Sequence, residues 1–119
     1  MARVSIIGAG SWGTALSMVL CENGYDVMLW SHRKEQSVEL EQTHVNSKLP
    51  GVKLPDKLQF TSDIAIACLN CNLIVLAVPS TATRETAVKI KPYIGKGQSI
   101  LAVSKGIEED THNWNIVVE

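Results

Sequence analysis

The sequence has little of what marks proteins that bind nucleic acid or enter membranes. Its 11 basic and 12 acidic residues give a formal net charge of −1, so the chain as a whole does not attract polyanions or anionic lipid surfaces. It has no apolar run long enough to span a bilayer. The apolar start faintly resembles a secretion signal, but Gly8, Gly10 and Gly13 interrupt it too early. We therefore expect no nucleic-acid partner and no membrane insertion.

Cysteine is scarce as well, and its number and spacing argue against two kinds of site. Three cysteines are an odd number, poorly suited to a disulfide framework. Cys68 and Cys71 form a C-x-x-C pair, but no second pair or neighbouring histidine completes a zinc set. We interpret both as reduced structural cysteines, expect no metal site, and expect the protein to be cytoplasmic.

The most informative stretch is Val4–Leu16, Val-Ser-Ile-Ile-Gly-Ala-Gly-Ser-Trp-Gly-Thr-Ala-Leu. It predicts a short buried strand, a glycine turn and the start of a helix. In this spacing Gly8 permits the tight turn, Gly10 lets the backbone approach a pyrophosphate, and Gly13 lets the helix pack closely on the sheet. The helix N-terminus offers N–H groups to an anion. The pattern predicts a dinucleotide site; the alternative is a glycine-rich turn that binds nothing.

A second strand completes the first structural unit. The helix is expected to stop at Asn23-Gly24, and Val27–Trp30 is a second apolar strand. A strand, a helix and a strand within about thirty residues form a right-handed crossover between parallel strands. We therefore predict an α/β fold of Rossmann type, with a doubly wound, mostly parallel sheet. The helical stripe predicted to face the core consists of Trp12, Ala15, Leu16, Val19 and Leu20.

The residues after the second strand bear on the choice of cofactor. Sites that prefer NAD usually place an acidic residue here to bind the ribose 2′-hydroxyl. This chain has Ser31, His32 and Arg33 instead, which can donate hydrogen bonds to a 2′-phosphate. We favour NADP(H), with NAD(H) as the second candidate. The alternative is a solvated basic turn that opens the next helix.

The middle of the chain alternates between predicted helices and strands. We expect a polar helix over 35–43, an irregular excursion over 46–56, a strand over 58–61, and a short helix over 64–67 capped by Ser62. A buried strand over 72–80, an amphipathic helix from 81 that lasts until Pro92, and a strand over 99–103 follow. The stretch 109–119 has no pattern that predicts a helix, a strand or a site.

Two residues beyond strand ends are further candidates for the cleft. Pro79 ends the strand over 72–80 and Lys105 follows the strand over 99–103, so both are expected at the sheet edge that carries Gly10. A lysine there can bind a phosphate or polarise a carbonyl. The alternatives are a plain strand-to-helix turn at Pro79 and an ordinary surface lysine at Lys105.

Four motifs together resemble the amino-terminal part of bacterial NAD(P)-dependent glycerol-3-phosphate dehydrogenase. They are Gly8–Leu16, Leu29–Arg33, Val78–Ser80 and Ser104–Glu108, in the right order and spacing. The resemblance covers the chain through about Asp110. It implies an enzyme that reduces dihydroxyacetone phosphate to sn-glycerol 3-phosphate for phospholipid synthesis.

Residue roles also follow from the resemblance. It implies that Ser11 and Trp12 touch the cofactor at the pyrophosphate turn, that His32 and Arg33 hold its adenosine end, and that Lys105 contacts both cofactor and substrate. The general acid/base lysine is expected beyond Glu119, so we expect no catalytic residue in this chain.

The resemblance further predicts how the domain is organised. Residues 1–119 are expected to form an incomplete NAD(P)-binding domain, without the helical substrate domain, that binds NADPH but does not turn over substrate. A homodimer is left open. The alternatives are another Rossmann dehydrogenase, acting on a hydroxy acid or sugar acid, and a nucleotide-sensing module without catalysis.

Overall fold

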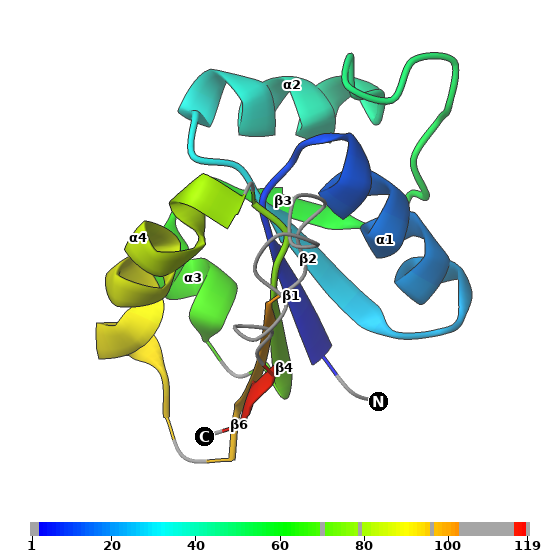
Figure 1. Ribbon diagram of the computed structural model, residues 1–119. Helices are drawn as coiled ribbons and strands as arrows, with labels where there is room; N and C mark the ends of the chain where they lie inside the picture. Colours follow the sequence, from blue (N-terminus) through cyan, green and yellow to red (C-terminus); the bar gives the residue numbers. More distant parts are fainter. Residues whose placement is uncertain (1–2, 70, 79, 96, 103–115, 119) are drawn as a thin grey trace.

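The computed structural model describes residues 3–69, 71–78, 80–95, 97–102 and 116–118 (Figure 1). Helices and strands alternate along most of the chain. The elements are β1 (Arg3–Ile7), α1 (Ser11–Glu22), β2 (Asp26–Trp30), α2 (Lys34–Thr43), β3 (Gln59–Thr61), α3 (Ile64–Cys68), β4 (Leu73–Leu76), α4 (Ser80–Ile90), a 3₁₀ turn η1 (Lys91–Tyr93), β5 (Ser99–Ala102) and β6 (Ile116–Val118). None of the helices in the described ranges is long and apolar enough to cross a membrane.

All the strands join one sheet in the order β3-β2-β1-β4-β5-β6. The first five strands are mutually parallel, and β6 pairs antiparallel with β5. The chain therefore moves outward from β1 to β3, then crosses to the other side of β1 for β4 and β5. This confirms the predicted Rossmann-type, doubly wound sheet. Sequence reasoning missed β6, which lies in the stretch that predicted nothing.

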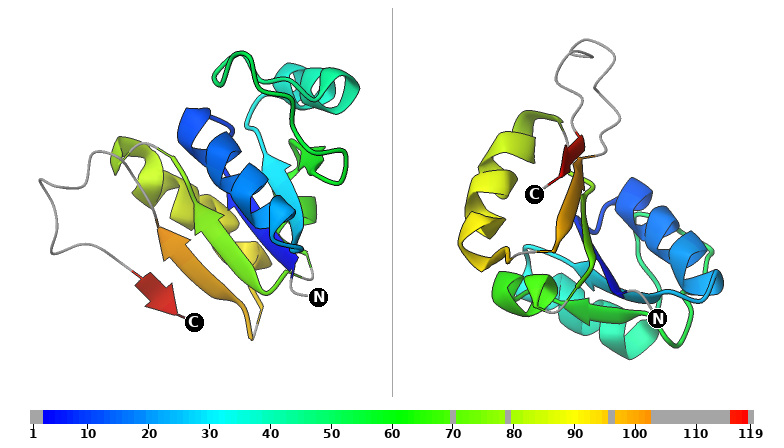
Figure 2. Two further views of the ribbon diagram at one scale, coloured as in Figure 1. Left: turned by 90° about the vertical axis from the view of Figure 1, so that its right-hand side faces the viewer. Right: turned by 90° about the horizontal axis from the view of Figure 1, so that it is seen from below.

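Helices cover both faces of the sheet (Figures 1 and 2). Helices α1 and α2 lie on one face, over a core that includes Val4, Ile6 and Leu29. Helices α3 and α4 lie on the other, over a core that includes Ile7 and Ile74. Adjacent residues of β1 thus enter different cores, and this explains why the strand is apolar without alternation.

The buried face of α1 differs from the predicted stripe. Trp12 and Val19 are 42% and 52% exposed, so the prediction that they face the core is wrong. Leu16 and Leu20 of the predicted stripe are partly buried and do pack against the core, whereas the fully buried positions are four small residues: Gly13, Thr14, Ser17 and Cys21. Because the helix lies very close to β1, only small side chains fit between them, and a pattern of large apolar residues does not reveal that face.

Two helix ends test the capping predictions. Gly24 has a φ of +92° just after α1, which confirms it as the residue that ends this helix. The cap of α3 was wrong by one residue: the Asp63 carboxylate, not Ser62, accepts a hydrogen bond from the Ala65 N–H. Serine and aspartate are both good N-caps, so adjacent candidates are not separable by residue type.

Candidate functional site

A cavity of about 410 Å³ opens where the carboxyl ends of β1, β2 and β4 meet. This is the point at which the strand order reverses, and open α/β sheets bind their ligands at such a point. Three of the lining segments directly follow these strands, and the others come from α2 and from the excursion after it. The lining residues are Gly8, Ala9, Gly10, His32, Arg33, Gln36, Lys48, Ala77 and Val78.

Two glycines are required by the packing of the turn after β1. Gly8 has a φ of +129°, and a Cβ there would overlap the carbonyl oxygen of Ala77. A Cβ on Gly13 would overlap the carbonyl oxygen of Gly8, so the start of α1 presses directly on the turn. The predicted close approach of helix and strand is therefore present, and it is made by backbone atoms.

Gly10 differs from its two neighbours. It is the N-cap of α1 with an ordinary φ of −79°, and a Cβ on it would meet nothing within 4 Å. Packing of the described residues therefore does not require a glycine here, whereas a side chain would project at the mouth of the cavity that Gly10 lines. No side chain in the described part of the chain caps this helix N-terminus, which leaves it open to an anion.

The β2–α2 turn brings two basic side chains to the cavity. His32 and Arg33 are exposed and line it, as predicted. Ser31 is only 1% exposed, its hydroxyl donates to Gln36 Oε1 at 2.5 Å, and its Oγ accepts the Arg33 N–H. Ser31 therefore supports the turn and does not face a ligand.

Sequence reasoning missed two polar residues of this wall. Lys48 lies in the irregular excursion and Gln36 in the first turns of α2, and both line the cavity. Lys48 adds a second cation beside Arg33 to this wall, and no described lining residue is acidic. A lysine in an irregular loop carries no sequence signal for such a position, whereas Gln36 lies three residues after Arg33 and thus on the same helical face.

The remaining predicted residues are not all brought to the cavity. Ser11 and Trp12 are exposed on the first turn of α1, beside Gly10 but outside the lining. Gly13 is buried against Gly8. Pro79 and Lys105 lie outside the described residues, so their expected positions stay predictions.

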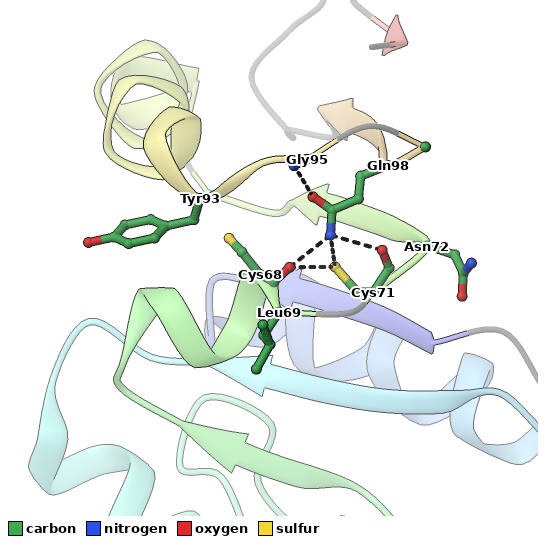
Figure 3. Close-up of a pocket in the computed structure, with 8 residues that line it drawn as sticks. Cys68, Leu69, Cys71, Asn72, Tyr93, Gly95 and Gln98 are labelled. Atoms are coloured by element: carbon green, nitrogen blue, oxygen red, sulfur yellow. Dashed lines mark hydrogen bonds between the residues drawn. The ribbon is translucent and has the colours of Figure 1, made fainter.

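A second cavity, of about 570 Å³, lies at the opposite edge of the sheet (Figure 3). Gln98 bridges its wall, because its Nε2 donates to the Cys68 and Cys71 carbonyls at 2.8 and 3.0 Å. Burial, with the neighbouring Cys71, raises the pKa of the Cys68 thiol to about 11, and burial also raises the pKa of Cys71. Such thiols are poor nucleophiles, and no group of metal-ligating residues occurs in the described ranges.

The residues of the first cavity fit a dinucleotide. An uncapped helix N-terminus beside an unobstructed glycine suits a pyrophosphate, and Arg33 and Lys48 suit a further phosphate. The doubly wound sheet and this site together define a dinucleotide-binding domain of the Rossmann class.

Comparison with known proteins identifies the family. The family model of the NAD-dependent glycerol-3-phosphate dehydrogenase N-terminus matches residues 3–118, and the chain belongs to this family. A glycerol-3-phosphate dehydrogenase [NAD(P)+] of Agathobacter rectalis is 54% identical over 93% of the chain, and one of Lysinibacillus sphaericus is 48% identical over the same share. The crystal structure of glycerol-3-phosphate dehydrogenase from Coxiella burnetii superposes with a TM-score of 0.82 at 34% identity, over 88% of the chain.

The match covers only part of these relatives. The chain spans 33% of the length of both curated relatives and 33% of the Coxiella burnetii chain. The family is NAD(P)-dependent, and the matched region is its nucleotide-binding part.

Proposed function

We propose that this chain binds NADP(H), and NAD(H) more weakly, as the nucleotide-binding part of a glycerol-3-phosphate dehydrogenase. The observation that carries the proposal is the cavity at the carboxyl edge, where Gly10 at an uncapped helix N-terminus shares the lining with three basic side chains, His32, Arg33 and Lys48, and no described acidic one. A carboxylate after β2 would repel a 2′-phosphate, whereas Arg33 attracts it.

Each wall of the cavity has a part in this binding. The backbone from Gly8 to Gly10 and the start of α1, with Ser11 and Trp12, take the pyrophosphate, while His32, Arg33 and Lys48 take the adenosine end. Pro79 and Lys105 complete the site on the nicotinamide side, with Lys105 also contacting the substrate. Of these residues, the described lining of the cavity includes Gly8, Gly10, His32, Arg33 and Lys48.

The parent reaction is the reduction of dihydroxyacetone phosphate to sn-glycerol 3-phosphate for phospholipid synthesis in the cytoplasm. NADPH, when bound, supplies the hydride for the ketone. This chain orients the cofactor, and we place the proton-donating lysine in the part of the relatives that the chain does not span.

The proposal is tested by comparing the affinities for NADPH and NADH in an Arg33 variant. We expect Arg33→Ala to weaken NADPH binding by roughly 1.5–3 kcal/mol, the scale of a hydrogen bond to a charged group. NADH, which lacks the 2′-phosphate, loses much less. Calorimetric titration measures both cofactors, and Lys91→Ala, an exposed cation on η1, is the matched control. Equal losses for NADPH and NADH would assign Arg33 to the adenine or to the fold.

A further inference from the structure

One backbone carbonyl in the glycine turn is held by two separate segments of the chain. The Ala9 oxygen accepts a hydrogen bond from Asn46 Nδ2 at 3.0 Å and another from Gln36 Nε2 at 3.2 Å. Gln36 also accepts the Ser31 hydroxyl, so it connects the β2–α2 turn to the glycine turn. Both lone pairs of this carbonyl are therefore used by side-chain amides that come from outside the turn.

The Asn46 side chain is buried within the protein and does not line the cavity. It is 1% exposed, and its Nδ2 also donates to Thr14 Oγ1 at 2.7 Å. Its Oδ1 accepts the N–H of Lys48 at 3.0 Å. Every polar atom of the side chain is thus paired within the protein, and one residue links the excursion that carries Lys48 to the glycine turn and to α1.

Because the peptide bond is planar, the orientation of the Ala9 carbonyl also fixes the orientation of the Gly10 N–H. The Ala9 carbonyl and the Gly10 N–H belong to one planar trans peptide, so they point in opposite directions. Because the carbonyl is turned toward Asn46 and Gln36, the Gly10 N–H is turned away from them. Among the described residues it has no hydrogen-bond acceptor, and Gly10 itself lines the cavity.

We propose that Asn46 is a positioning residue for pyrophosphate binding: by fixing the Ala9 carbonyl it holds the Ala9–Gly10 peptide in the orientation that presents its N–H to the anion. The inference rests on the proposed function, because it assigns the pyrophosphate to this turn. Preorganised donors bind an anion better than donors that must first be ordered. Losing the Asn46 donor to Ala9 therefore weakens ligands that carry the pyrophosphate, whereas ligands that occupy only the adenosine end are unaffected as long as the Asn46 acceptor for the Lys48 N–H is kept.

Variants at Asn46 and at Thr14, each titrated with two ligands, distinguish a positioning role of Asn46 from a purely structural one. Asn46→Ala removes the donor to Ala9, and Asn46→Asp replaces it with an oxygen of similar size that repels the carbonyl. The control Thr14→Val breaks the buried Asn46–Thr14 hydrogen bond but keeps the bond to Ala9. Each folded variant of the 119-residue chain is titrated with NADPH and with adenosine 2′-monophosphate, which has no pyrophosphate, and its unfolding is followed by circular dichroism.

The proposal predicts a split between the two ligands. NADPH affinity falls about tenfold in Asn46→Ala and further in Asn46→Asp. Asn46→Asp keeps an oxygen for the Lys48 N–H, so its affinity for adenosine 2′-monophosphate stays within about twofold. Thr14→Val loses stability but keeps its NADPH affinity. Equal losses for the two ligands in Asn46→Asp, or a Thr14→Val loss of NADPH affinity that matches that of Asn46→Ala, would overturn the positioning role. If the unsubstituted chain binds neither ligand, the proposed function fails and the inference with it; if it binds NADPH and the Asn46 variants bind it equally well, only the inference fails.

Discussion

The two edges of the sheet each carry a cavity, and these cavities differ in chemistry. The larger one, at the amino edge, is bridged by Gln98, whose side chain is paired with backbone groups on both sides. The smaller one, at the carboxyl edge, has an uncapped helix N-terminus and the cations Arg33 and Lys48. The larger cavity is therefore not the one whose lining suits a phosphate.

This difference shows what marks a binding site in this fold. At the amino edge the protein satisfies its own polar groups, so a ligand there would have to displace existing hydrogen bonds. At the carboxyl edge the helix N–H groups and the basic side chains have no anion among the described residues, so a phosphate adds interactions without breaking any. Substitutions at the two edges should therefore affect stability and NADPH affinity differently.

Gly13→Val is expected to have the largest effect, and on stability. Its Cβ would overlap the Gly8 carbonyl, and α1 cannot move outward without losing its contacts with β1. We expect the free energy of unfolding to fall by about 3 kcal/mol. Urea denaturation followed by circular dichroism measures this, and wild-type stability in the variant would contradict the close packing.

Gly10→Val lies in the same turn, but we expect it to lower NADPH affinity far more than stability. The added side chain meets no described residue, so we expect stability to fall only by about 1 kcal/mol, the cost of a poorer N-cap. NADPH affinity is expected to fall by about a hundredfold, because the side chain occupies the approach of the pyrophosphate. Calorimetry on the folded variant measures the affinity. An unchanged affinity would remove the pyrophosphate from this turn.

Gln98→Leu tests the amino edge. It leaves the Cys68 and Cys71 carbonyls without their donor, and we expect a loss of about 1–3 kcal/mol in stability. NADPH affinity is expected to stay unchanged, since Gln98 is far from the carboxyl edge in the sheet. A loss of NADPH affinity larger than that of Arg33→Ala would show that the amino edge takes part in binding.

The thiols at the amino edge give the smallest effect, a dependence of stability on pH. Because the pKa of Cys68 is raised from 9.0 to about 11 in the folded chain, the unfolded chain loses this proton first. The stabilisation is therefore complete below pH 9 and is lost as the pH rises toward 11. Urea denaturation across this range, with Cys68→Ala as the comparison, measures the slope. An identical slope in both proteins would contradict the assigned burial.

The parts of the carboxyl edge that follow a strand could be predicted from the sequence. Gly8, Gly10, His32 and Arg33 each come directly after an apolar run, so their position on one edge follows from parallel pairing.

The parts that depend on tertiary contact could not be predicted. Lys48 lines the cavity from an irregular excursion, and the hydrogen bonds of Asn46 in the same excursion span 37 and 32 residues of sequence. The predicted buried face of α1 was wrong at Trp12 and Val19, because the fully buried positions of this helix are small residues that an apolar pattern does not reveal. The antiparallel β6 has only three residues, too few for periodicity to reveal.

The central claim is that the carboxyl-edge cavity binds NADP(H). Calorimetric titration of the 119-residue chain with NADPH, repeated with NADH, tests it most directly. The account predicts saturable binding of a single NADPH with an affinity higher than that for NADH. No saturable binding of NADPH, or binding that Gly10→Val and Arg33→Ala both leave unchanged, would contradict it.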